Sequence, residues 1–268
     1  MNSVELFLQQ NILETKFQPG HVWLAGAGPG DPRYLTVEVL CALVQADALV
    51  YDALVDAKVL ALSENSRKYF AGKRGGKPST SQEDITALLI SLAQSGKKVL
   101  RLKGGDPFIF GRAGEEIQEL VKAHIPVRVL SGITSAFAAL TRAHIPMTMR
   151  GVNKAIILAT GHSADESSPE LDWKALAKTG QPLVIYMGLK NIEFIAKNLI
   201  DGGLKTETPV AIISAAATAK ECLNISSLGR VVEDVQRHHI TAPALFAVGD
   251  IVALRDVLTG TFSQEEIS

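Results

Sequence analysis

Residues 99–116 read VLRLKGGDPFIFGRAGEE, an apolar run that ends in two glycines and is followed by a cluster of charged residues. The run from 98 to 102 predicts a buried strand, and Gly104 and Gly105 free the backbone for close approach to a bulky ligand. The charged residues that we expect to crowd the following loop are Lys103, Asp106, Arg112, Glu115 and Glu116. An open α/β sheet binds its ligand outside the carboxyl ends of its strands. The run therefore predicts such a sheet, with a binding loop at its edge.

Short apolar strands alternate with helical segments along the rest of the chain. Strands are expected at 22–25, 48–51, 98–102, 127–130, 154–159, 183–186, 210–213, 223–228 and 245–248. Helices are expected at 36–45, 81–92, 131–143, 173–177 and 192–200, and 223–228 alternates like an antiparallel strand. This order predicts an α/β fold with two α/β/α domains, the first sheet mostly parallel and the second mixed. We expect an N-terminal extension at 1–19 and domains at 20–148 and 149–261, joined near 146–153.

Composition excludes several classes of protein. The 268 residues are 47% hydrophobic and carry a formal net charge of -1, which argues against a general nucleic-acid binder. Cys41 and Cys222 lie far apart, and the spacing of the histidines and cysteines predicts no metal site. No apolar run approaches the roughly 20 residues that span a bilayer, and residues 1–18 lack the order of a signal peptide. We therefore expect a cytoplasmic protein with no membrane or nucleic-acid partner.

The glycine loop at 26–32, GAGPGDP, invites a dinucleotide interpretation, with Asp52 as the ribose-binding acid. Asp31 stands where that fingerprint requires glycine, and Pro29 and Pro32 remove backbone N–H groups from the place where a pyrophosphate needs them. A loop poor in amides suits a nucleoside without phosphates. A dinucleotide-dependent oxidoreductase nevertheless stays open as a remote alternative.

Six motifs in order carry a resemblance to a known family. They are 26–32, Tyr51-Asp52, Gly72-Lys73-Arg74, the run 99–116, 132–135 and Tyr186-Met187-Gly188. The chain resembles the uroporphyrinogen-III C-methyltransferases of the tetrapyrrole methylase superfamily over residues 20–258. The resemblance implies S-adenosylmethionine as methyl donor, S-adenosylhomocysteine as its product, and two successive methylations of uroporphyrinogen III, through precorrin-1 to precorrin-2. It also implies a role in sirohaem or cobalamin biosynthesis, and a homodimer with the cofactor in the interdomain cleft.

The same resemblance assigns the site residues. The cofactor-binding positions it implies are Pro29, Gly104, Gly105, Asp106, Ile109, Thr134, Ser135, Met187, Ala216 and Ala244. It implies Asp52 as proton acceptor and Lys73 as proton donor. It links Arg112, Glu115 and Arg150 to substrate binding and catalysis.

These residue types suit the implied chemistry. A sulfonium methyl donor is already activated, so the protein's work is to align the reacting atoms. Arginines such as Arg112 and Arg150 bind the carboxylates of the macrocycle through a planar fork. Methylation of a pyrrole carbon leaves a ring that must lose a proton, and Asp52 and Glu115 are both candidate bases. Because arginine stays protonated, we assign Arg112 an electrostatic and positioning role.

Three positions depart from the family pattern. Met149 replaces the usual histidine before Arg150, Ala113 replaces a common glycine, and residues 214–224 lack the usual arginine. The last difference weakens the placement of Ala216. Besides the oxidoreductase, the alternatives are a methylase of a later precorrin intermediate and a non-catalytic binding protein with a degenerate cofactor site.

Overall fold

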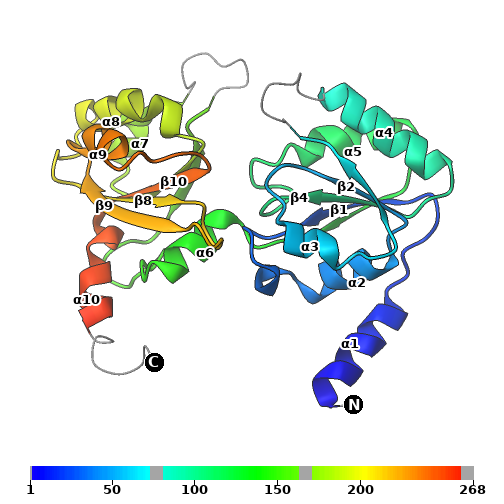
Figure 1. Cartoon of the computed structure of the whole chain (residues 1–268). Helices are drawn as coiled ribbons and strands as arrows, with labels where there is room; N and C mark the ends of the chain where they lie inside the picture. The colour runs from blue at the N-terminus through cyan, green and yellow to red at the C-terminus, as the bar shows by residue number, and fades with distance from the viewer. Residues whose placement is uncertain (1, 73–80, 163–170, 261–268) are drawn as a thin grey trace. The chain divides into compact units, whose positions relative to one another are not determined.

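The chain folds into two compact units, Met1–Ser135 and Ala136–Ser268. The computed structural model describes residues 2–72, 81–162 and 171–260 of the chain (Figure 1). The division falls at the start of helix α6 (Ser135–Arg142), earlier than the boundary near 148 that turn residues suggest. An ion pair between Arg142 and Glu221 ties this helix to the second unit.

A five-stranded parallel sheet forms the centre of the first unit. Its strands are β1 (Val22–Gly26), β2 (Ala48–Tyr51), β3 (Arg67–Phe70), β4 (Val99–Lys103) and β5 (Val127–Leu130). Their order is β3-β2-β4-β1-β5, and every described pair is parallel. All residues of β1 and β4 are buried, as expected for strands covered on both faces. This confirms the parallel sheet predicted for the first half of the chain.

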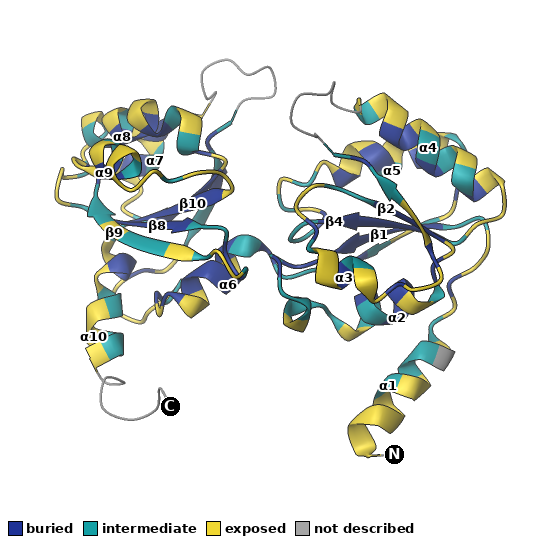
Figure 2. Ribbon diagram, in the orientation of Figure 1, coloured by how far each residue is buried: buried dark blue, intermediate teal, exposed yellow. Residues whose placement is uncertain are grey.

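Helices cover both faces of this sheet (Figure 1). They are α2 (Val37–Gln45), α3 (Ala57–Ala61), α4 (Gln82–Gln94) and α5 (Ala113–Lys122). Helix α1 (Ser3–Glu14) contacts α2 and extends away from the sheet, and a 3-10 turn η1 (Pro32–Tyr34) precedes α2. One core cluster joins α2 and α3 to Trp23 and Leu100, and the other joins α4 and α5 to Leu24 and Val99. Alternate residues of each strand therefore face opposite helical layers. The buried strands lie between helices whose outer faces are exposed (Figure 2).

The second unit has a mixed sheet of five strands. They are β6 (Ile157–Thr160), β7 (Leu183–Tyr186), β8 (Pro209–Ser214), β9 (Cys222–Ser227) and β10 (Ala244–Val248), in the order β6-β7-β10-β8-β9. Only β6 and β7 are parallel among the described pairs. The other elements are α7 (Trp173–Lys178), α8 (Ile192–Asp201), α9 (Val231–Arg237), α10 (Leu254–Gly260), η2 (Leu189–Asn191) and η3 (Asp250–Val252). The α/β class and the mixed second sheet are thus confirmed.

Helix length and hydropathy bear on membrane contact. Among the described residues, the structure contains no helix with the length and apolar character that crossing a bilayer requires.

Candidate functional site

Two glycine loops meet at the carboxyl edge of the first sheet. The N–H of Gly105 donates to the carbonyl of Gly28 at 2.8 Å, and the N–H of Gly28 donates back at 3.2 Å. Both glycines have φ of +71°, a conformation that other residues adopt only with strain. The loop after β1 and the loop after β4 are therefore joined by their backbones.

A third glycine completes a junction that excludes side chains. A Cβ atom on Gly132 would lie 2.2 Å from the carbonyl oxygen of Gly105, and one on Gly26 would lie 2.5 Å from the same atom. No side chain fits at either position without a backbone shift. The loops after β1, β4 and β5 consequently present main chain rather than side chain at this edge, which suits close approach of a ligand.

Two carboxylates hold these loops in place. Asp106 accepts the N–H of Gly132 on Oδ2 at 3.0 Å and the N–H of Phe108 on Oδ1 at 2.9 Å. Asp52, directly after β2, accepts the N–H of Leu54 on Oδ1 at 2.9 Å and the N–H of Gly104 on Oδ2 at 3.3 Å. Asp52 therefore lies against the Gly104 turn.

The loop before α5 carries strain and exposed aromatic rings. Phe110 and Arg112 have φ of 53° and 55°, in the left-handed region, and Phe108 and Phe110 are exposed. Strained conformations of this kind cluster at functional sites. A hollow of about 410 Å³ is lined by Pro107, Phe108, Phe110, Gly111, Arg112, Ala113, Gly114 and Glu115.

Arg112 and Glu115 form a two-pronged ion pair on this loop. Arg112 Nε donates to Oε1 at 2.9 Å and Nη2 to Oε2 at 2.6 Å. Hydrogen bonding from Arg112 lowers the pKa of the Glu115 carboxyl, and the same bond raises the pKa of Arg112. Both side chains stay more than half exposed, so a substrate carboxylate has access to the guanidinium.

The expectation from the sequence that Lys103 and Glu116 crowd the loop is wrong. Both side chains are buried beneath it, with Lys103 Nζ 2.9 Å from Glu116 Oε1. Arg112 directly precedes α5, and successive helical residues differ by about 100° in direction. Glu115 consequently faces outward and Glu116 inward. A charged residue within an apolar strand, such as Lys103 in β4, is the sequence signal that indicates a buried partner of opposite charge.

The remaining expected cofactor residues form two groups, one in each unit. Ile109 lies on the loop after β4 with Gly104, Gly105 and Asp106. Pro29 lies on the loop after β1, the buried Thr134 lies on the loop after β5, and Ser135 begins α6. In the second unit, Met187 follows β7, Ala216 follows β8 and Ala244 begins β10. The register pairs Tyr186 with Leu245 and Ser214 with Ala244, so the three residues meet at one edge of that sheet.

The loop after β8 has a support that sequence analysis missed. Ala215 and Ala217 have φ of 47° and 57°. Glu221 Oε2 accepts the N–H of Ala217 at 2.5 Å and Arg142 Nε at 2.8 Å. The carboxylate thereby fixes a strained loop that contains Ala216. Arg142 and Glu221 lie far apart in the sequence, so their spacing could not predict that they form an ion pair.

Two expected catalytic residues are not among the described residues of the first unit. Arg150 is an exposed turn residue of the second unit, and Lys73 lies outside the described residues. Asp52, Arg112 and Glu115 all belong to the first unit, where Asp52 bonds Gly104 and the other two residues lie at the start of α5.

The chain is similar in sequence to a family of known proteins. Residues 21–231 match the family model of the Tetrapyrrole (Corrin/Porphyrin) Methylases. The chain belongs to the tetrapyrrole methylase family. It is 45% identical over 243 residues to a uroporphyrinogen-III C-methyltransferase of Sinorhizobium sp., covering 90% of this chain and 87% of the relative. It is 43% identical over 252 residues to the siroheme synthase of Acinetobacter baylyi, covering 94% of this chain and 55% of the relative.

A solved structure resembles the fold of this methylase closely. The crystal structure of uroporphyrin-III C-methyl transferase from Thermus thermophilus, complexed with S-adenyl homocysteine, matches with a TM-score of 0.77 and 35% identity. The match covers 87% of this chain and 99% of that one. By contrast, the chain spans about half the length of the siroheme synthases that it matches.

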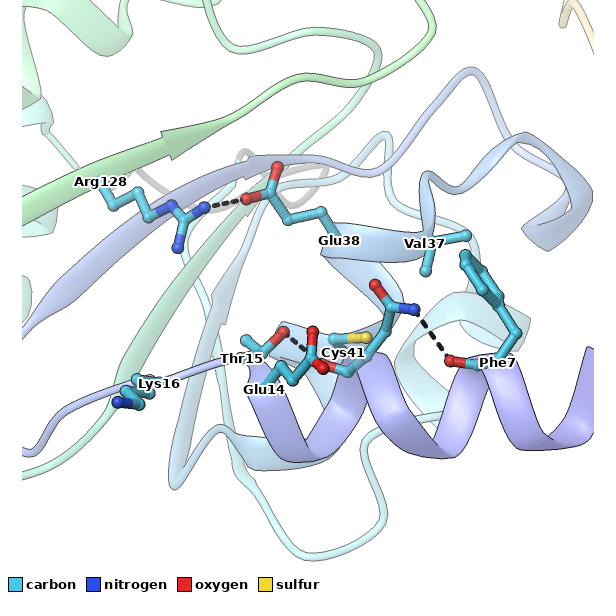
Figure 3. Close-up of a pocket in the computed structure, with 9 residues that line it drawn as sticks. Phe7, Glu14, Thr15, Lys16, Val37, Glu38, Cys41 and Arg128 are labelled. Carbon is cyan, nitrogen blue, oxygen red and sulfur yellow. Dashed lines mark hydrogen bonds and ion pairs between the residues drawn. The ribbon is translucent and has the colours of Figure 1, made fainter.

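A second hollow in this methylase, of about 480 Å³, lies away from the expected site residues. Its lining residues are Phe7, Asn11, Glu14, Thr15, Lys16, Val37, Glu38, Cys41 and Arg128, from α1, α2, β5 and the chain that follows α1 (Figure 3). An ion pair joins Arg128 to Glu38, and burial raises the pKa of the Cys41 thiol. None of these lining residues belongs to the motifs that carry the family resemblance.

Proposed function

We propose that this methylase transfers two methyl groups in succession from S-adenosylmethionine to carbon atoms of uroporphyrinogen III, through precorrin-1 to precorrin-2, for sirohaem or cobalamin-type biosynthesis. The observation that carries the proposal is the three-glycine junction of Gly26, Gly105 and Gly132, followed along the same loop after β4 by the Arg112–Glu115 pair. The similarity to C-methyltransferases, one of them complexed with the demethylated donor, supports it.

The residues present fit the cofactor. The backbones of Gly26, Gly105 and Gly132 pack too closely for a side chain, which leaves main-chain groups for a nucleoside, and Pro29 and Pro32 remove amides that a pyrophosphate would use. The residues that would hold the cofactor in the first unit are Pro29, Gly104, Gly105, Asp106, Ile109, Thr134 and Ser135. Those in the second unit are Met187, Ala216 and Ala244. S-adenosylmethionine, when bound, supplies a methyl group activated by its sulfonium.

The chain's own groups align the acceptor and take up a proton. Arg112 and Arg150 bind carboxylates of the macrocycle through charge-assisted hydrogen bonds. As the new carbon–carbon bond forms, the methyl group leaves the sulfur of the donor, and the methylated ring system then releases a proton to Asp52 or Glu115. Each carboxylate keeps lone pairs beyond those used in the structure. Lys73 is the proposed proton donor.

A direct assay tests the function. The protein is incubated anaerobically with S-adenosylmethionine and uroporphyrinogen III, and the products are analysed by mass spectrometry. We expect a tetrapyrrole carrying two added methyl groups and release of S-adenosylhomocysteine. Methylation of a later precorrin intermediate, without methylation of uroporphyrinogen III, would assign the alternative substrate. Binding of S-adenosylhomocysteine without any methyl transfer would indicate a degenerate, non-catalytic site.

Two further properties belong to the same proposal. We infer a homodimer and a cytoplasmic location, both from the family resemblance. Light scattering in solution tests the first, and fractionation of cells that produce the protein tests the second. Family membership argues against the dinucleotide-dependent oxidoreductase, and titration with NADH provides the negative control.

A further inference from the structure

Asn153 is a buried polar residue in the segment that carries Arg150. Its carboxamide oxygen accepts the N–H of Met149 at 2.9 Å. Its Nδ2 donates to the carbonyls of Met147 and Ala155, each at 2.9 Å. The oxygen and both N–H groups of the carboxamide therefore have main-chain partners. Because the two carbonyls lie on either side of Arg150 in the chain, one buried side chain closes this segment into a loop.

The backbone that Asn153 holds forms a tight turn with Arg150 at its corner. The N–H of Val152 donates to the carbonyl of Met149 at 3.0 Å, and Gly151 has φ of +85°. A positive φ at the third residue of a turn closed in this way is typical of a type II turn, whose second residue is here Arg150. The exposed Arg150 therefore stands at a backbone position that the turn fixes.

Burial in this segment is the reverse of what stability alone favours. The apolar side chains of Met149 and Val152 are each 40% exposed, whereas Asn153 is 9% exposed. Asparagine is mostly an exposed residue, and its buried hydrogen bonds stabilise a fold only modestly because they replace bonds to water. The exposed side chain of Met149 also leaves the turn dependent on the main chain at this position. Asn153 therefore serves the shape of the turn rather than an apolar core.

A second amide side chain anchors the end of this segment to the second sheet. Gln181 Oε1 accepts the N–H of Lys154 at 3.2 Å and the N–H of Ala155 at 3.0 Å. Gln181 lies directly before Pro182 and β7. The turn that Asn153 holds is consequently attached to a rigid element, as a preorganised binding group requires.

We propose that Asn153 is a positioning residue, which holds the turn so that Arg150 is preorganised to bind a carboxylate of the tetrapyrrole. The inference rests on the proposed function, in which Arg150 binds the acceptor. A guanidinium binds a carboxylate through a planar fork, so a shift of the turn costs Arg150 a charge-assisted hydrogen bond. Asn153 contacts no ligand itself and acts through Arg150.

The test is a double-mutant cycle of Asn153→Ala with Arg150→Ala. In the parent background, Asn153→Ala should lower kcat/KM for uroporphyrinogen III about tenfold, as loss of one charge-assisted hydrogen bond predicts. The KM for S-adenosylmethionine should stay unchanged. In the Arg150→Ala background the same substitution should lower kcat/KM less than about twofold, because the group that it positions is already absent.

Asn198→Ala is the matched control for this cycle. Asn198 lies in the same unit, and its Nδ2 also donates to a main-chain carbonyl, that of Phe194, at 2.8 Å. Its removal should leave kcat/KM unchanged. Equal losses from Asn153→Ala in both backgrounds, or an unfolded Asn153→Ala, would show that Asn153 serves the fold alone and would overturn the inference.

Gly151→Ala disturbs the same turn without changing Asn153. A Cβ atom on Gly151 meets nothing within 4 Å, so only its positive φ is strained. This variant should also lower kcat/KM for the tetrapyrrole in the parent background and leave it unchanged in the Arg150→Ala background. Unchanged kcat/KM of either turn variant in the parent background would contradict the proposal.

Limited digestion with trypsin gives a readout that needs no methyl transfer. Cleavage after Arg150 should be about tenfold faster in Asn153→Ala than in the parent and in Asn198→Ala, because cleavage follows the population of the opened turn. Cleavage after Lys220, an exposed loop residue of the same unit, is the internal reference and should be equal in all three proteins. Equal cleavage after Arg150 would refute the role of Asn153. A parent that methylates no tetrapyrrole would refute the proposed function alone, since the digestion still tests whether Asn153 holds the turn.

Discussion

At the scale of single residues, Arg112 combines strain with exposure. Its left-handed backbone and its pairing with Glu115 place an exposed guanidinium on the loop that follows Gly104 and Gly105. A charged hydrogen bond is worth roughly 1.5–3 kcal/mol, so Arg112→Ala should lower kcat/KM for the tetrapyrrole about 10- to 100-fold. The Kd for S-adenosylhomocysteine and the Tm should change little, because exposed ion pairs contribute at most about 1 kcal/mol. Steady-state kinetics and calorimetric titration check this, and equal losses would place Arg112 on the cofactor.

A substitution at Gly105 tests whether main-chain groups form the cofactor site. A Cβ atom there would point toward Thr134 Cα at 3.7 Å and Ser135 N at 3.8 Å, both cofactor-binding positions in the proposal. Gly105→Leu should therefore abolish binding of S-adenosylhomocysteine. Gly96→Leu is the matched control, since Gly96 also has positive φ but nothing within 4 Å of its Cβ position. Both variants lose about 1–2 kcal/mol to backbone strain, and normal cofactor binding by Gly105→Leu would contradict the proposed site.

At the scale of elements, the predictable parts are those with a local signal. The capping box of Ser81 with Asp84 predicted the start of α4, and continuous apolar runs predicted β2 and β7. β3 was not predicted, because its exposed Arg67 and Lys68 do not form the apolar pattern of a strand. α5 was not predicted, because its N-cap residue Arg112 makes no side-chain capping hydrogen bond and so gives no local signal for a helix start. Glu116 was assigned to the loop for the same reason, since only a helix there turns it inward.

The loop between β8 and β9 depends on a long-range ion pair. Removing the charge of Glu221 weakens its hold on Arg142 and on the N–H of Ala217. Glu221→Gln should weaken binding of S-adenosylhomocysteine about tenfold, the equivalent of about 1.4 kcal/mol, while the protein stays folded. Glu207→Gln is the control, because Glu207 is exposed and its side chain bonds the adjacent Thr206. Unchanged affinity in Glu221→Gln would show that the loop needs no such support.

At the scale of the whole molecule, each unit has its own core and its own tryptophan. Trp23 stacks on Phe17 in the first unit, and Trp173 is buried in the core of the second. Apolar periodicity predicted both sheets, because burial decides which residues form a strand. It did not reveal which charges are buried, since pairing across β4, α4 and α5 depends on tertiary packing. The fluorescence of Trp173→Phe and Trp23→Phe variants therefore reports on each unit separately.

The buried charges give the first unit its own pH dependence. Because Arg101 and Lys103 outweigh burial and lower the pKa of Glu116, the folded state binds its proton less readily than the unfolded state. The stability that Glu116 contributes is therefore complete above its ordinary pKa of about 4.3 and is lost as pH falls through its lower folded value. Urea midpoints followed by Trp23 should fall in this acidic range more steeply than those followed by Trp173.

Lys103 gives the first unit a rise in stability at alkaline pH. Its folded pKa lies below the ordinary value of about 10.4, so its deprotonation relieves the charge excess that two buried cations, Lys103 and Arg101, leave beside the one carboxylate of Glu116. Lys103→Met should abolish that alkaline rise and retain the acidic loss, and midpoints that fall in parallel for both tryptophans would separate the pH dependence from Glu116.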